Sequence, residues 1–471
     1  MAHIEREIKL SLTPQSLPRL ARLAPRRRNV ASVYFDTSRQ ELRRAGVALR
    51  LRRDGGQWLQ TVKAESAQHA GLAARSEWEL PVRGKALEPE AFPGEEIRSV
   101  TGIDIQRLAR RLHPVFETRF SRRSGLVQVD GKVSAELSID RGAIIAGKRR
   151  ETISEVELEL ISGDTAALLS FAEALALPLA YESKAERGYR LAAGLTRAPR
   201  RWRMPEIAPS GKPGDAFDAV FSAALMQAGT NVAGMLASKD PEYLHQLRVG
   251  LRRLRSVIGA FSPVVEDAKP LKRALRHLMP PLGAARDWDV FVQTLHDAGA
   301  GARVLQRARR ARDIARRAAQ ETVASPPFRA FLFQSLRWLQ SNPGREGDAA
   351  LQDFAPGRLE RLHRKAVKDY EPRNAKRRHR FRICIKRLRY ASHFFAGCFP
   401  ANAVQPHLRQ LARLQDILGE LNDIATARKL LREIDAPRPG ELKQREAKLI
   451  AALEATWKRF ASLPPYWRHP G

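Results

Sequence analysis

The periodicity of this sequence changes once, near residue 200, and that change limits the folds available to the chain. Before it, short stretches alternate with a period of two, as in IEREIKL, VALRLRR and SEVELEL, which is typical of β-strands. From about residue 215 onward, long stretches rich in Ala, Leu and Arg follow the period of a helix. We therefore expect an α+β multidomain protein, with an N-terminal antiparallel β domain followed by an all-α domain.

The segment between these two regimes has the composition of a linker. Residues 196–215 contain four prolines and two glycines, which disfavour both helix and strand. We expect a strand domain at 1–195, a linker at 196–215, a helical domain at 216–435, and a C-terminal helical extension and tail at 436–471.

The helical region contains an internal repeat. HQLRVGLRRLR at 245–255 matches HRFRICIKRLR at 379–389 with an offset of 134 residues, and LGAARD at 282–287 matches LGELND at 418–423 with an offset of 136. Two matches in the same order at nearly the same offset indicate duplication. The predicted domain is therefore two helical-bundle halves, at about 216–300 and 355–435.

The charge of the chain predicts a polyanionic partner. Lys and Arg number 83 against 51 Asp and Glu, a formal net charge of +32, of which +9 falls in residues 1–200 and +23 in the remainder. Such an excess suits nucleic acid, a phosphate polymer or an anionic membrane surface. The two cysteines cannot form a disulfide framework, the N-terminus is too charged for a signal peptide, and no apolar run approaches a membrane span. The expected location is a reducing cytosol.

The predicted strands carry charge of both signs on one face. Glu5, Glu7 and Lys9 share a face, as do Arg50 and Arg52, because side chains two residues apart point the same way. Strands with such faces suit a barrel lined with Arg, Lys and Glu, where a polyphosphate would meet the cations and a divalent metal the carboxylates. The alternative is a sandwich whose charged faces meet solvent.

The order of these charges resembles that of the CYTH domain, the triphosphate tunnel metalloenzyme family. The resemblance covers about residues 1–193 and begins with the ExExK pattern of EREIK at 5–9. The stretches that follow it in the family's order are YFDT at 34–37, LRLR at 49–52, TVKAE at 61–65, RSEWEL at 75–80, FETRFSR at 116–122, LSIDRG at 137–142, SEVELEL at 154–160 and ESKAERGYR at 182–190.

The resemblance implies an antiparallel barrel that hydrolyses a triphosphate with Mg²⁺ or Mn²⁺. Water would attack in line, without a covalent nucleophile. The implied catalytic residues are Glu5, Glu7 and Lys9, with substrate held by Lys9, Arg50, Arg52, Lys63, Arg119 and Lys184. The implied metal ligands are Glu5, Glu7, Asp140, Glu155 and Glu157, with Glu159 as a further candidate.

The repeated helix carries a basic stripe in both copies. The residues fall at helical spacing beside an apolar stripe, so that an anion could lie across each copy. A solvated face is the alternative. The first stripe is His245, Arg248, Arg252 and Arg255, the second is His379, Arg382, Lys386 and Arg389, and a further basic row pairs Arg273 and His277 with Arg409 and Arg413.

The repeat resembles the CHAD domain over about residues 216–435. That resemblance implies binding of inorganic polyphosphate on the basic faces of two four-helix halves. Asp287 and Asp423 are interpreted as carboxylates that orient the arginines or cap a helix, rather than as metal ligands. His245 and His379 are expected to stay neutral among the arginines.

The leading hypothesis is an inorganic triphosphatase with an attached polyphosphate-binding domain. The alternative is a non-catalytic polyphosphate-binding or granule-targeting protein. A nucleic-acid-binding protein is less favoured, because aromatic residues make up 7% of the chain and none lies within the two stripes. Nonspecific nucleic acid binding at low salt is still expected from the charge. The sequence predicts neither the oligomeric state nor the preferred phosphate chain length.

Overall fold

The computed structural model describes residues 3–54, 56–69, 72–129, 131, 133–341, 349–437 and 440–468. The chain divides into two compact units. The first comprises Met1–Pro199 and Arg329–Ser341, and the second comprises Arg200–Phe328 and Asn342–Gly471.

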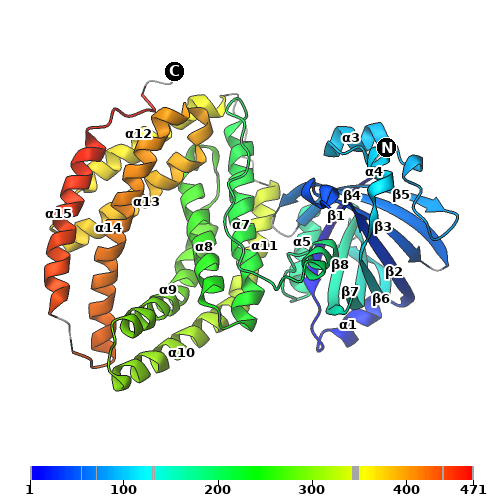
Figure 1. Cartoon of the computed structure of the whole chain (residues 1–471), viewed down its shortest axis with the longest axis horizontal. Helices are drawn as coiled ribbons and strands as arrows, with labels where there is room; N and C mark the ends of the chain where they lie inside the picture. The colour runs from blue at the N-terminus through cyan, green and yellow to red at the C-terminus, as the bar shows by residue number, and fades with distance from the viewer. Residues whose placement is uncertain are drawn as a thin grey trace. The chain divides into compact units, whose positions relative to one another are not determined.

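The first unit is built on a closed antiparallel barrel (Figure 1). Its strands follow the order β1-β5-β4-β3-β2-β6-β7-β8 around the barrel, so the expected strand domain is confirmed and the sandwich alternative is wrong. The strands are β1 (His3–Ser11), β2 (Arg26–Asp36), β3 (Val47–Asp54), β4 (Gln57–His69), β5 (Leu72–Val82), β6 (His113–Val129), β7 (Val133–Ala146) and β8 (Arg149–Ser162).

Much of the apolar core of this unit lies outside the barrel wall. Leu49, Val62 and Trp78 project from β3, β4 and β5 and are buried against Phe92 and Ile97. Because side chains alternate along a strand, an apolar outer face leaves the charged set for the interior. The helices of the unit are α1 (Leu17–Leu23), α2 (Glu41–Arg44), α3 (Gly94–Thr101), α4 (Ile105–Leu108), α5 (Thr165–Ala174) and α6 (Lys184–Ala192).

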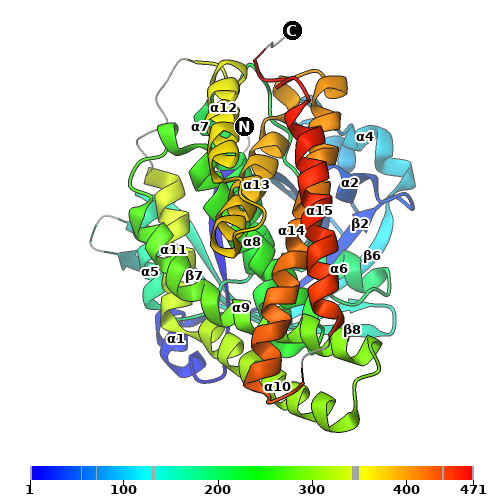
Figure 2. The same cartoon turned by 90° about the vertical axis from the view of Figure 1, so that its left-hand side faces the viewer.

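The second unit contains two sets of four long helices among its described residues (Figure 2). The first set is α7 (Pro213–Ala237), α8 (Pro241–Ala260), α9 (Lys269–Asp297) and α10 (Ala302–Ala324). The second is α12 (Leu351–Asp369), α13 (Ala375–Phe394), α14 (Ala401–Glu433) and α15 (Glu441–Ala461); α11 (Pro326–Ser341) lies between them in sequence.

The helix pairing repeats between the two sets. In the first, α7 packs on α8 and α9 on α10; in the second, α12 packs on α13 and α14 on α15. The two copies of the basic stripe fall on α8 and α13, which contact each other. The duplication expected from sequence therefore corresponds to two equivalent helical halves, each including a fourth helix beyond the repeated segments.

Helix α7 is more apolar than the sequence reading allowed. It has the length and hydropathy of a membrane span, with a mean hydropathy of 1.2 over its most apolar window. Within the helical unit, however, 72% of that window is buried, as expected for a core helix.

Candidate functional site

Strand registers bring many of the charged strand residues to one face of the barrel wall. Glu7 pairs with Glu159 and Lys9 with Glu157, while Lys63 pairs with Glu77. Because cross-strand partners point to the same side, the face can be followed around the closed barrel. The charged residues on it include Glu5, Glu7, Lys9, Arg50, Arg52, Lys63, Arg75, Glu77, Glu79, Arg122, Glu136, Asp140, Glu155, Glu157 and Glu159.

A buried group of three carboxylates lies on β7 and β8. Oxygen atoms of Asp140, Glu155 and Glu157 all lie within 4.8 Å of one another. The ammonium group of Lys184, at the start of α6, lies among them, 2.7 Å from Asp140 Oδ2 and 2.9 Å from Glu157 Oε1, and it also pairs with Glu155. Ser183 and Glu186 form a capping box that begins α6 and so positions Lys184.

Two further cations compensate the charge of Glu157. Arg122 binds Asp140 with both Nε and Nη2 at 2.7 Å and reaches Glu157 Oε2 at 2.5 Å, while Lys9 also pairs with Glu157. Burial alone would raise the pKa of Glu157, but Lys184, Lys9 and Arg122 hold it well below its usual value. Burial likewise opposes the charge of Lys9, yet Glu157 and Glu7 raise its pKa. Both groups therefore stay ionised.

The carboxylates of β1 form a second, neighbouring arrangement. Glu5 lies 2.5 Å from Lys63 Nζ, and Glu7 lies 2.9 Å from Lys9 Nζ and also pairs with Arg75. Glu159 stands beside them, and burial together with the charge of Glu5 raises its pKa to about 7. A cation bound here would stabilise the ionised form of Glu159, which burial and the neighbouring carboxylates otherwise disfavour.

Arg50 and Arg52 line the interior from β3. Arg52 Nη2 lies 2.8 Å from Glu79, whereas Arg50 is 3.8 Å from Glu77. Burial depresses the pKa of Arg52, and the neighbouring Arg50 adds to that effect. These paired guanidinium groups suit a ligand with several anionic oxygens.

The structure places Arg119 on the outside of the barrel. It pairs with Ala31 and Ala143, whose faces point away from the charged interior, and its side chain is 65% exposed beside Glu117. Arg122, three residues on, has the opposite parity and faces inward. Period-two counting from the buried Phe116 and Phe120 would have selected Arg122.

Arg75 is a further interior cation that the sequence reading did not assign. In the sequence, only its spacing of two and four residues from Glu77 and Glu79 indicates that Arg75 shares their face of the strand. All the remaining expected tunnel residues lie together on the inner face or, for Lys184, against it.

The carboxylate group fits a hard divalent cation. Its donors are all oxygens, which Mg²⁺ and Mn²⁺ prefer, and they already surround one positive charge, the ammonium group of Lys184. Asp140, Glu155 and Glu157 are near enough to share an ion. Glu5 and Glu7 lie on the adjacent strand and would approach the same region of the interior.

In the helical unit, the middle residues of the two stripes converge. Arg252 donates through Nε to the Tyr390 hydroxyl, at 3.1 Å, which ties α8 to α13. Burial lowers the pKa of Lys386 to about 7, and the nearby Arg382 and Arg252 add to this effect. Arg248 donates to the carbonyls of Leu282 and Gly283 on α9. We define the central basic cluster as Arg248, Arg252, Arg382 and Lys386.

Two aspartates lie near the central basic cluster. Asp287 on α9 interacts electrostatically with Arg248, Arg382 and Asp423, and Asp423 on α14 also interacts with Arg382. Burial and the surrounding arginines lower the pKa of both His245 and His379, in the direction expected from sequence.

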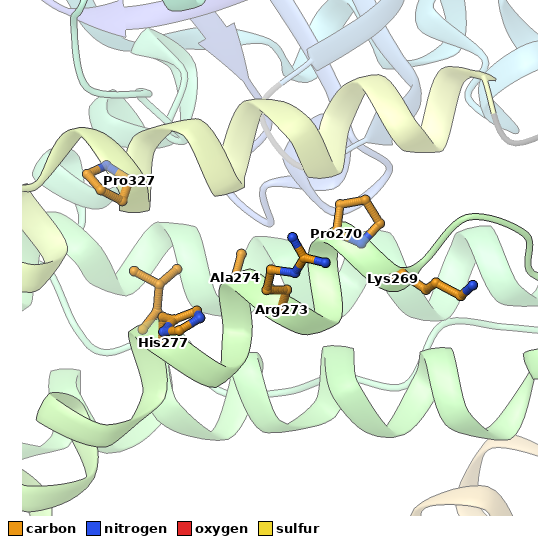
Figure 3. A pocket seen from close by; sticks show the side chains of 7 residues that line it. Lys269, Pro270, Arg273, Ala274, His277 and Pro327 are labelled. Carbon is orange, nitrogen blue, oxygen red and sulfur yellow. The ribbon is translucent and has the colours of Figure 1, made fainter.

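The other predicted basic residues lie away from that cluster. Arg273 lines a separate pocket of about 430 Å³, with Lys269 and His277 along α9 (Figure 3). Arg255, Arg409 and Arg413 are exposed on their helices, and Arg389 is half-buried beside Arg253. The structure thus separates a converged central set from a peripheral one.

Comparison with known proteins identifies two domain families. Residues 3–189 match the CYTH domain, and residues 219–432 match the CHAD domain. An inorganic triphosphatase from Haemophilus influenzae is 32% identical over 212 residues, which are 42% of this chain and 58% of that protein, so the match spans little more than half of that relative. The crystal structure of the CHAD domain from the plant Ricinus communis is 28% identical, with a TM-score of 0.50, and the match covers 57% of this chain and 99% of that one.

Proposed function

We propose that this chain, which carries a CYTH domain followed by a CHAD domain, hydrolyses inorganic triphosphate inside the barrel and binds inorganic polyphosphate on its helical unit. The observation that supports hydrolysis most directly is the buried group of Asp140, Glu155 and Glu157 within an interior that also presents Arg50, Arg52 and Lys63. Carboxylates for a metal ion and cations for phosphate oxygens face the same enclosed space.

The residues divide between holding the substrate and holding the metal. Arg50, Arg52, Arg122 and the lysines would bind phosphate oxygens and keep the chain aligned with an attacking water. Mg²⁺ or Mn²⁺ on Asp140, Glu155 and Glu157, with Glu5 and Glu7 beside them, would offset the negative charge that develops on the phosphates. Substrate oxygens would then replace some of the carboxylate partners that the interior cations have in this structure.

The helical unit supplies a binding surface rather than a reaction centre. Arg248, Arg252, Arg382 and Lys386 come from both repeated halves, and burial together with Arg382 and Arg252 lowers the pKa of Lys386, so its charged form would gain from a neighbouring anion. A phosphate polymer would supply it. The free thiols Cys384 and Cys398 agree with the further proposal of a reducing cytosolic location.

Phosphate release by the full-length protein tests the proposed reaction. We expect release from tripolyphosphate with Mg²⁺ or Mn²⁺ and none with chelator. Glu7→Gln, which removes a charge from the interior, should lower the rate at least a hundredfold, whereas Glu117→Gln, on the outer face beside Arg119, should leave it nearly unchanged. Absence of release from the wild-type protein at every pH between 6 and 10, with polyphosphate binding retained, would instead support the non-catalytic alternative.

A further inference from the structure

A pocket in the helical unit lies apart from the barrel interior and from the central basic cluster. It has a volume of about 430 Å³, which is typical of small-molecule sites, and all of its lining residues belong to the second unit (Figure 3). Six of the seven lining residues come from the first three turns of α9, and the seventh is Pro327, in the first turn of α11. Neither of the sites described above includes this combination of side chains.

The α9 residues of the pocket form two parallel rows, one basic and one apolar. Members of each row are four residues apart, so they follow one another along one face of the helix at about 6 Å per step. The second row starts one residue after the first, about 100° around the helix axis. The basic row is Lys269, Arg273 and His277, and the apolar row is Pro270, Ala274 and Leu278. A ligand in the pocket would therefore meet polar donors on one side and apolar surface on the other.

The basic row has no partner within the described part of the chain. No hydrogen bond or ion pair among the described residues involves Lys269, Arg273 or His277, and all three side chains are exposed. Residues 269–286 of α9 include no Asp or Glu, so this stretch of the helix offers the row no carboxylate. Like charges one helical turn apart repel each other, and an anion bound across them would offset that repulsion.

The apolar side of the pocket ends in two exposed prolines. Pro270 and Pro327 both stand in the first turn of a helix, where the missing backbone N–H costs no hydrogen bond. Their rings are exposed, whereas Leu278 is 5% exposed. Rigid rings lose little conformational freedom when a ligand covers them. This side of the pocket therefore suits a flat apolar group.

We propose that the pocket binds a nucleoside diphosphate, with its phosphates on the basic row and its base against Pro270 and Pro327. The proposal does not depend on hydrolysis in the barrel. Lys269 and Arg273 are one helical turn apart, which suits two linked phosphates, and the planar Arg273 group offers two donors to one of them. An inorganic phosphate chain would satisfy the basic row only, because it has no group to cover the apolar row.

The internal repeat indicates which residue keeps the pocket open. At the offset of 136 residues, Arg273 corresponds to Arg409, so the cation is present in both halves, but Ala274 corresponds to Gln410. Ala274 has no side-chain atom beyond Cβ, whereas a glutamine at this position would extend into the space beside Arg273 and Leu278. Ala274→Gln therefore introduces a residue that the equivalent helix of the other half already carries.

Calorimetric titration of the full-length protein with ADP or GDP tests the proposal. Chelator prevents the proposed metal-dependent hydrolysis, and excess tripolyphosphate occupies the barrel and the central basic cluster. We expect one nucleotide to bind per chain under these conditions, and pyrophosphate, which lacks a base, to bind at least tenfold more weakly. Loss of nucleotide binding in tripolyphosphate, or equal affinities for ADP, GDP and pyrophosphate, would overturn the proposal. Nucleotide binding by a protein that releases no phosphate from tripolyphosphate would refute the hydrolysis alone.

Three variants locate the bound nucleotide. Ala274→Gln keeps every charge and should weaken nucleotide binding at least tenfold. Arg273→Gln should do the same, whereas Arg276→Gln removes the same charge from an exposed position of α9 outside the pocket and should change the affinity less than twofold. Equal losses in the two arginine variants would indicate diffuse attraction and overturn the assignment, as would unchanged affinity in folded Ala274→Gln protein. The arginine pair remains decisive if Ala274→Gln does not fold, because both arginines are exposed.

Discussion

At the scale of single residues, Lys386 shows how burial and neighbouring cations destabilise a positive charge that a bound anion would stabilise. It is partly buried near Arg382 and Arg252, and burial with these neighbours lowers its pKa to about 7. The ammonium group is therefore only half populated at neutral pH. A bound phosphate chain would stabilise the charged form, so binding would take up a proton above pH 7.

The affinity for long-chain polyphosphate should therefore fall as the pH rises from 7 to 9, by up to tenfold per pH unit, and level off below pH 7. Internal phosphates of the polymer remain ionised over this range. Lys386→Arg, which keeps its charge, should remove most of that dependence. Titrations at constant ionic strength measure it, and equal pH profiles for the two proteins would contradict a role for Lys386.

At the scale of elements, the basic stripes matter because two helices meet. Each stripe alone would be a solvated helix face. Contact between α8 and α13, held in part by the bond from Arg252 to Tyr390, brings residues 134 positions apart into one cluster. The charges then act on a common ligand, and their mutual repulsion is relieved when an anion binds.

Reversing Arg252 and Lys386 to Glu should weaken polyphosphate binding at least tenfold more than reversing Arg309 and Arg310. The control arginines are exposed on α10. Each double variant replaces two cations with two carboxylates, so the net charge changes equally in both. Arg316 is a poorer control because it donates to the carbonyl of Ser238, at 2.8 Å. Equal losses in the two double variants, measured by equilibrium binding, would indicate diffuse electrostatic attraction instead of a defined cluster.

At the scale of the whole molecule, a net charge of +32 governs how any polyanion approaches. Long-range attraction speeds association and is strongly screened by salt. It favours duplex DNA and polyphosphate alike, so discrimination between them depends on local geometry. The central basic cluster concentrates positive charge from two helices, and its neighbour Tyr390 already stacks on Phe394, which suits a polymer of phosphate better than one whose bases need stacking partners.

The full-length protein should bind polyphosphate more tightly than duplex DNA at physiological salt. Neutralising four phosphates of a single chain predicts a slope of roughly −3 in a plot of log affinity against log salt. Competition between the two labelled polymers, repeated over a range of salt concentrations, measures both quantities. Tighter binding of DNA would direct the assignment toward nucleic acid.

Much of the candidate site could be predicted because it depends on spacing within single elements. Alternation along β1 and β8 places Glu5 with Glu7 and Glu155 with Glu157 on common faces whatever their neighbours are. Helical spacing likewise places Arg248 with Arg252, and the duplicated motif shows that both halves are built alike. These are local consequences of backbone geometry, and the structure retains all of them.

Tertiary structure decided which of these faces and charges act together. Alternation places Arg119 and Arg122 on opposite faces of β6, but the pairing of β6 with β2 and β7 decided which of these faces lines the charged interior. The packing of α6 against β6, β7 and β8 and the meeting of α8 with α13 likewise join segments far apart in the chain. Local periodicity determines the face of an element, whereas register and packing depend on contacts that no single segment encodes.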